Sequence, residues 1–253
     1  MDLHLRGKRV LITGASKGIG AAAAEAFAEE GCHIMLAARN GDQLKALAER
    51  LRSAHQIDAT AHVVDLRKPE DIVRLVKDAA DIDILVNNAG DIPGGSVDKI
   101  DEPTWRHAWE LKVFGYINIT RAIYAQMKAR GHGVIVNDIG VAGEKFDANY
   151  ICGSTGNAAL MAFTRALGKQ APADGLRVVA INPGPVETER LVMLQRDNAA
   201  KTLGDPERWR ELTKGMPFGR PAKPEEIGYA VAFLASERSG YTSGTVLTIN
   251  GGG

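Results

Sequence analysis

Cysteine is scarce in this chain of 253 residues, where Cys32 and Cys152 are the only two. Two cysteines are too few for a disulfide framework and lack the spacing of metal ligands, so we expect a protein of a reducing compartment, the cytoplasm. The six histidines are scattered, and no two have the spacing of a ligand pair on a helix or in a zinc finger. The sequence therefore predicts no metal site.

Long apolar runs and an excess of charge are missing as well. The first residues contain no apolar stretch typical of a signal peptide, and no later stretch reaches the ~20 apolar residues needed to span a bilayer. Lys and Arg together number 31, and so do Asp and Glu. This balance offers no basic surface for nucleic acid or for an anionic membrane. Small molecules are therefore the expected partners.

Short apolar segments alternate along the chain with longer segments of helical periodicity. The seven expected strands are 10–12, 34–36, 63–64, 84–86, 134–136, 178–181 and 246–249. The expected helices are 18–31, 41–54, 69–80, 103–130, 150–170 and 224–236. Strict alternation predicts a parallel sheet, and near-continuous apolar strands predict helices on both of its faces. We expect an α/β, Rossmann-type, doubly wound fold that forms one domain over residues 1–253.

One long segment, about residues 185–222, interrupts this alternation and is richer in charge, Met and Pro than its surroundings. Open α/β sheets bind ligands beyond the carboxyl ends of their strands. An insertion before the last helix is therefore predicted to form a lid over the ligand. Its apolar residues predict an apolar cover, which suits an aromatic or alicyclic ligand without identifying it: Leu191, Val192, Met193, Leu194, Leu203, Trp209 and Met216.

A glycine-rich turn follows the first expected strand and opens the first expected helix. It reads Thr13-Gly14-Ala15-Ser16-Lys17-Gly18-Ile19-Gly20. Glycines let the backbone turn sharply and approach a pyrophosphate closely, while the start of the helix offers free amides and a partial positive charge. The turn therefore predicts a dinucleotide site.

The end of the second expected strand indicates which dinucleotide is bound. A carboxylate at this place would accept the ribose 2'-hydroxyl of NAD, but the strand is followed by Arg39 and Asn40. Arg39 and Lys17 are two cations that can converge on a 2'-phosphate, and an arginine can bind it bidentately. The sequence therefore favours NADP(H) over NAD(H).

Further segments resemble one known family over nearly the whole chain. Four segments resemble those of the short-chain dehydrogenase/reductase family. They are the Gly-x-x-x-Gly-x-Gly turn, Asn87-Asn88-Ala89-Gly90, Asn182 to Thr188 and Ser243 to Gly252. The resemblance implies oxidoreductase activity, a homotetramer built from the helices at 103–130 and 150–170, and a set of cofactor contacts. These contacts are Gly14, Ser16, Lys17, Gly18, Ile19, Gly20, Arg39, Asp65, Leu66, Asn88, Ala89, Gly90, Tyr150, Pro183, Gly184, Val186 and Thr188.

The catalytic residues depart from this family, which usually carries Asn, Ser, Tyr and Lys, the last two as Tyr-x-x-x-Lys on one helix. Aligning Tyr150 with that tyrosine puts Ser154 at the lysine position. Gly140 stands at the serine position and Lys112 at the asparagine position, and the loop between Gly140 and Tyr150 is about three residues short. Of the four catalytic residues usual in the family, this chain thus keeps only the tyrosine.

A free tyrosine has a pKa near 10, and a nearby cation is the usual means of lowering it. We hypothesise that Lys112 reaches into the space left by Ser154 and restores the positive charge. The serine is expected to be replaced by a backbone amide or a water near Gly140. With weak activation of Tyr150, carbonyl reduction by NADPH should be slow, and alcohol oxidation should be measurable mainly at high pH.

Two functions remain open from the sequence. The first is an NADP(H)-dependent oxidoreductase that acts on a small or medium carbonyl or hydroxyl compound. The alternative is a non-catalytic NADP(H)-binding sensor or structural pseudoenzyme. What separates them is whether Lys112 and Tyr150 form a working proton path.

Overall fold

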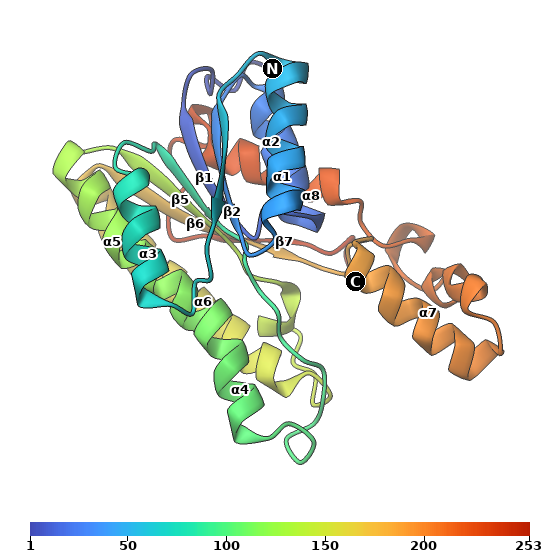
Figure 1. Cartoon of the computed structure of the whole chain (residues 1–253). Coiled ribbons are helices and arrows are strands. Elements are labelled where there is room, and N and C mark those ends of the chain that lie inside the picture. The colour runs from blue at the N-terminus through green and yellow to red at the C-terminus, as the bar shows by residue number, and fades with distance from the viewer.

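The computed structural model describes residues 1–253 and contains one sheet of seven parallel strands (Figure 1). The strands are β1 (Arg9–Thr13), β2 (His33–Ala38), β3 (Ala59–Val63), β4 (Ile84–Asn87), β5 (Gly133–Asp138), β6 (Leu176–Pro183) and β7 (Val246–Ile249). Their order in the sheet is β3-β2-β1-β4-β5-β6-β7, which reverses direction between β1 and β4. The predicted doubly wound α/β fold is confirmed.

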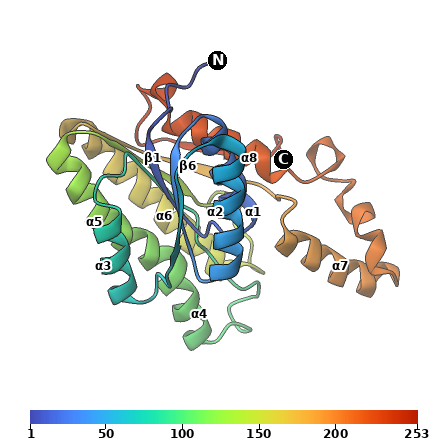
Figure 2. The same cartoon turned by 45° about the horizontal axis from the view of Figure 1, so that its top comes forward.

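Helices cover both faces of the sheet (Figures 1 and 2). They are α1 (Gly18–Glu29), α2 (Gly41–His55), α3 (Pro69–Asp78), α4 (Glu102–Trp109), α5 (Gly115–Arg130), α6 (Ile151–Gln170), α7 (Glu189–Leu203) and α8 (Pro224–Ala235). One buried cluster joins α1, α2 and α8 to one face, and others join α3, α5 and α6 to the opposite face. No helix is both long and apolar enough to cross a bilayer.

Alternating side chains of each strand supply the two cores. Ile12 and Val10 of β1 belong to the cluster beneath α1, whereas Leu11 belongs to the cluster beneath α3 and α5. Both faces are therefore apolar, as a parallel sheet covered on both sides requires. The helices α1 and α8 approach so closely that a Cβ on Gly228 would lie 2.7 Å from the Ala22 carbonyl oxygen.

The expected single helix over 103–130 is wrong in detail. The chain forms α4, then a π-helical turn, η1 (Glu110–Phe114), and then α5. A π-helical turn inserts extra backbone into the helical repeat and often occurs at functional sites. The third strand also ends at Val63, rather than lying at the expected residues 63–64.

The segment 185–222 contains more regular structure than a loop. It holds α7, a long 3₁₀ segment η4 (Pro206–Thr213) and a short one, η5 (Pro217–Gly219). The side chain of Thr188 caps α7 by accepting a hydrogen bond from the Leu191 amide (3.3 Å). In Figures 1 and 2, α7 projects away from the sheet on the side of the C-terminus.

Candidate active site

Close contacts hold the glycine turn after β1 in one shape. Gly14 and Gly18 have φ of 66° and 60°, which other residues adopt only with strain. A Cβ on Gly20 would lie 2.5 Å from the Gly14 carbonyl oxygen, so a side chain does not fit there. The Asn88 amide donates hydrogen bonds to the carbonyl oxygens of Thr13 (2.9 Å) and Gly14 (3.1 Å). The turn therefore has no room for a side chain at Gly14 or Gly20.

The start of α1 is open to an anion. Lys17 occupies the N-cap position without making a side-chain capping bond. The first amides of a helix have no partner within the helix, and the helix dipole adds a partial positive charge there. The turn and the helix start together therefore fit the diphosphate of a dinucleotide.

A cavity of about 1280 Å³ lies beyond the carboxyl ends of the strands and contains most of the predicted site. The predicted cofactor residues that line it are Gly14, Ser16, Lys17, Gly18, Ile19, Arg39, Leu66, Asn88, Ala89, Gly90, Tyr150, Pro183, Gly184, Val186 and Thr188. The predicted catalytic residues Lys112 and Gly140 line it too. Gly20, Asp65 and Ser154 do not. The cavity thus joins the glycine turn to Tyr150.

The two cations at the adenosine end differ in their contacts. Arg39 is exposed and lines the cavity beyond β2. Lys17 also lines it, but its Nζ lies 3.2 Å from the carboxylate of Glu189 in α7. Asp65 is engaged elsewhere, because Arg67 binds its carboxylate at 2.6 Å. Arg39 is therefore the cation with the clearer access to a 2'-phosphate.

Tyr150 immediately precedes α6, and its ring lies over the first turn of that helix. A Cβ built on Gly153 would lie 2.0 Å from Cε1 and 2.3 Å from Cζ of the Tyr150 ring. Burial raises the pKa of Tyr150, while the charge of Arg190 lowers it and those of Cys152 and Asp91 raise it further. The balance keeps the phenol protonated.

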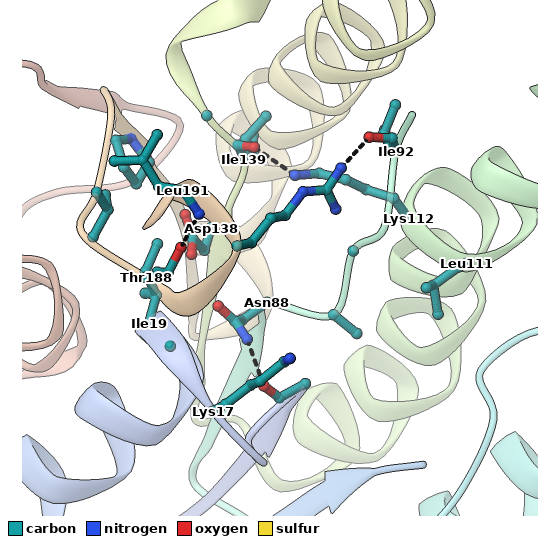
Figure 3. Close-up of a pocket in the computed structure, with 18 of the residues that line it drawn as sticks. Lys17, Ile19, Asn88, Ile92, Leu111, Lys112, Asp138, Ile139, Thr188 and Leu191 are labelled. Atoms are coloured by element: carbon teal, nitrogen blue, oxygen red, sulfur yellow. Dashed lines mark hydrogen bonds between the residues drawn. The ribbon is translucent and has the colours of Figure 1, made fainter. Parts of the chain in front are cut away.

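Lys112 lies on the π-helical turn and extends along the cavity wall toward β5 (Figure 3). Its ammonium donates a hydrogen bond to the Ile139 carbonyl oxygen at 2.6 Å. Burial lowers the pKa of Lys112, Asp138 raises it, and Arg190 lowers it. The ammonium is thus partly desolvated and held close to the turn that contains Gly140.

Asp138, at the end of β5, is a second buried ionisable group in the cavity wall. Burial raises the pKa of its carboxyl to about 6, against the opposing effect of Lys112. The Tyr116 hydroxyl donates to its backbone carbonyl oxygen (2.7 Å) and so fixes the end of the strand. Asp138 and Lys112 form the charged part of this wall.

Ser154 is predicted to stand at the lysine position, beside the cavity. Ser154 does not line it, and its hydroxyl accepts a hydrogen bond from the Asp147 amide (3.1 Å). The α6 residue that faces Gly140 is Asn157, whose Nδ2 donates to the Gly140 carbonyl oxygen at 3.1 Å. Asn157 lines the cavity. The sequence analysis did not single it out, because counting four positions from Tyr150 ends at Ser154.

Arg190 is the other residue that the sequence did not single out. It lies at the start of α7 and lines the cavity. Its guanidinium donates to the carboxylate of Asp91 (2.8 Å) and to the carbonyl oxygen of Ile92 (2.5 Å), both beyond β4. Arg190 thus connects α7 to the segment that follows β4. A single arginine in a charged segment carries no signal of this contact.

The predicted apolar cover is only partly present. Leu191 and Leu194 line the cavity, whereas Val192, Met193, Leu203, Trp209 and Met216 do not. Trp209 is instead buried, 2% exposed, in η4. Asp147 and Arg190 contribute polar groups to the cavity. The wall around Tyr150 is therefore more polar than the sequence suggested.

The geometry of this site can be compared with known proteins. A family model described as short chain dehydrogenase matches residues 8–199. The chain belongs to the short-chain dehydrogenase family. It is an oxidoreductase of this family, as the expected resemblance implied.

Curated relatives cover nearly the whole chain. The 2-keto-3-deoxy-L-fuconate dehydrogenase of Xanthomonas campestris is 33% identical over an alignment of 255 positions, which covers 99% of this chain and 81% of that protein. The oxidoreductase UcpA of Escherichia coli K12 is 36% identical over an alignment of 255 positions, which covers 98% of this chain and 95% of the relative. Both are named as enzymes, which favours a catalytic function over a non-catalytic one.

Among solved structures, the L-sorbose reductase from Gluconobacter frateurii complexed with NADPH and L-sorbose superposes with a TM-score of 0.94. It is 32% identical, and the match covers 99% of this chain and 98% of that chain. The actinorhodin polyketide ketoreductase with NADPH has a TM-score of 0.91 and 28% identity, and the match covers 97% of each chain. The neighbours thus bind a nicotinamide cofactor in the same fold.

Proposed function

We propose that this protein is an NADP(H)-dependent oxidoreductase that reduces a carbonyl compound, or oxidises the corresponding alcohol, with Tyr150 as the proton donor and acceptor. The observation that carries the proposal is that Tyr150, Lys112 and the glycine turn line one cavity. The glycine turn would hold the diphosphate of the dinucleotide at one part of this cavity, and Tyr150 lines the same cavity. The altered residues at 140 and 112 then form part of a working site.

The chain's own residues account for the proton. When bound, NADPH supplies the hydride for the carbonyl carbon. The protonated phenol of Tyr150 donates its proton to the carbonyl oxygen, and burial favours this protonated form by raising the pKa of Tyr150. Lys112 supplies positive charge that stabilises the phenolate left behind. A backbone amide near Gly140 is proposed to orient the carbonyl, since position 140 has no side chain.

The direction of reaction provides a test of this function. Reduction needs the phenol, so its rate should remain flat from pH 7 to 8, above the pKa of about 6 of Asp138. Oxidation needs the phenolate and should rise with pH because the pKa of Tyr150 is raised. The experiment measures NADPH consumption with a panel of keto sugars and other ketones, and NADPH formation with the alcohols. Tight NADPH binding without turnover in either direction at any pH would refute the catalytic proposal.

Polyhydroxylated ketones are the proposed substrate class. Two of the similar proteins are named for such compounds, a keto-deoxy sugar acid and L-sorbose. The polar groups of Asp147, Asn157 and Arg190 around the cavity suit hydroxyl-bearing ligands better than the aromatic or alicyclic ones first considered. Ketones without hydroxyl groups should be poorer substrates in the same panel.

The cofactor preference is proposed to rest on Arg39. A charge-assisted bond to a phosphate is worth ~1.5–3 kcal/mol. Replacing Arg39 with Ala should therefore weaken NADPH binding about 10- to 100-fold and leave NADH binding nearly unchanged. Fluorescence titration with each nucleotide measures both constants. The control is Lys45→Ala, which removes an exposed cation from α2 outside the cavity. Equal losses for both nucleotides would remove Arg39 from this role.

The lid and the assembly complete the proposal. We propose that residues 185–222 form a lid of a single-domain enzyme, held to the body by Arg190. We also propose a homotetramer, in line with the family resemblance. Large apolar side chains are exposed at Phe114 on η1, at Tyr229 and Phe233 on α8, and at Leu247 on β7, and these are candidates for burial between subunits. Sedimentation velocity of the purified chain tests the oligomeric state.

A further inference from the structure

Asn157 has a hydrogen-bond acceptor with no partner. Its side chain is 3% exposed and lines the cavity, and its Oδ1 is buried without a hydrogen bond. Its Nδ2 donates to the Gly140 carbonyl oxygen, so turning the amide over would place two oxygens in contact. The orientation of the amide is therefore determined, and an unpaired buried acceptor is unfavourable. We therefore expect the Oδ1 atom of Asn157 to accept a hydrogen bond from a group in the cavity.

Lys112 has N–H groups that make no hydrogen bond within the protein. An ammonium carries three N–H groups, and the one hydrogen bond of Lys112 goes to the carbonyl oxygen of Ile139. Ile139 and Gly140 are consecutive residues of the turn after β5, so Lys112 and Asn157 hold neighbouring carbonyl groups from two different helical elements. The charged groups that act on Lys112 are Asp138 from β5, which favours the ammonium, and Arg190 from α7, which disfavours it.

The position of the Tyr150 ring relates both residues to the catalytic motif of the family. The ring lies where a side chain at position 153 would begin, three residues later in the chain than Tyr150 itself. Positions 153 and 157 have the i, i+4 spacing of a Tyr-x-x-x-Lys pair on one helix face. The loop before Tyr150 is short, and Gly153 has no side chain in the way of the Tyr150 ring. The ring therefore occupies the place that the side chain of a tyrosine at position 153 would take. In this register Asn157 stands where the motif has its lysine, while Lys112 stands where the family has its asparagine.

We propose that Lys112 and Asn157 have exchanged positions and act as one unit, in which Asn157 Oδ1 accepts a hydrogen bond from the Lys112 ammonium, directly or through one water, and holds the cation beside the Tyr150 phenol. Asn157 is then a positioning residue. The inference rests on the proposed function for its role in turnover. After Tyr150 has given its proton to the carbonyl oxygen, the phenolate takes a proton from the Lys112 ammonium, and the neutral amine takes one from water.

The first test measures Lys112 itself and needs no turnover. Lysine labelled with ¹³C at Cε reports the protonation of Lys112 by NMR titration, and Lys112→Arg identifies its signal. Asn157→Leu should increase the acid dissociation constant of the ammonium about tenfold by removing the acceptor, equivalent to about 1.4 kcal/mol. Asn157→Asp should decrease it instead, because it adds a negative charge. A merely structural role would not give opposite shifts.

Asn182 provides a matched control for this test. Its Oδ1 is also buried and unpartnered, but it does not line the cavity. Asn182→Leu should therefore leave the titration of Lys112 unchanged, and thermal unfolding shows whether each variant is folded. If Asn157→Leu and Asn157→Asp leave the titration as in the wild type, or shift it in the same direction, the proposed unit does not exist.

The second test is the reciprocal exchange. Lys112→Asn removes the cation and Asn157→Lys duplicates it, so each single variant should lose at least tenfold in kcat. The double variant K112N/N157K restores one ammonium and one amide and should recover most of this loss, with NADPH affinity unchanged. A double variant as poor as the worse single one would overturn the exchange. If the wild type shows no turnover, the proposed function fails, and the titration still decides the interaction.

Discussion

Replacement of Tyr150 with Phe is expected to lower kcat for carbonyl reduction by about 10²- to 10⁴-fold, the usual contribution of a positioned general acid. Phe keeps the ring that packs on Gly153 and removes only the hydroxyl. The NADPH dissociation constant should therefore stay within about twofold of the wild-type value. Steady-state kinetics with the best ketone of the panel, together with fluorescence titration of NADPH, measure both quantities.

Tyr229→Phe is the control for this change. Tyr229 lies on α8, is 53% exposed and does not line the cavity. It should leave both kcat and NADPH binding unchanged. A Tyr150→Phe protein that keeps its kcat would show that another group supplies the proton, and the assignment of Tyr150 would then be wrong.

Lys112→Met is expected to give the second-largest effect. At ~4 Å and an effective dielectric constant of ~20, a cation stabilises a phenolate by ~4 kcal/mol, and even half of that is worth about 30-fold in rate. Alcohol oxidation starts from the phenolate, so it should lose about 30-fold or more at pH 7. Reduction starts from the phenol and should lose less. Rates in both directions between pH 6 and 10 provide the comparison, and the pH at which oxidation rises should move upward.

Lys169→Met serves as the matched control, because Lys169 is an exposed lysine in the last turn of α6 outside the cavity. It should not change either pH profile. Equal losses in the two directions, with no shift of the oxidation profile, would indicate that Lys112 supports the structure of the turn rather than the charge of the site.

Near Tyr150, the sequence alone did not identify every residue that lines the cavity. Lys112 and Gly140 were found because each follows a recognisable local pattern, and the structure places both in the cavity. Counting four positions from Tyr150 along the chain gives Ser154, whereas the α6 residue that lines the cavity is Asn157. The ring of Tyr150 instead folds over Gly153, and this packing is a contact in space that spacing along a helix does not contain.

The sequence by itself determined the α/β fold, the glycine turn and the absence of a carboxylate after β2, since these depend on local periodicity and on backbone conformations that only certain residues adopt. Only the tertiary structure decided which side chains meet in the cavity. Arg190 forms a hydrogen bond to Asp91, 99 positions earlier in the sequence. Asn157 of α6 donates a hydrogen bond to the turn that follows β5. Such contacts depend on how the helices and strands pack against one another and on which side chains become buried. A local sequence pattern specifies neither.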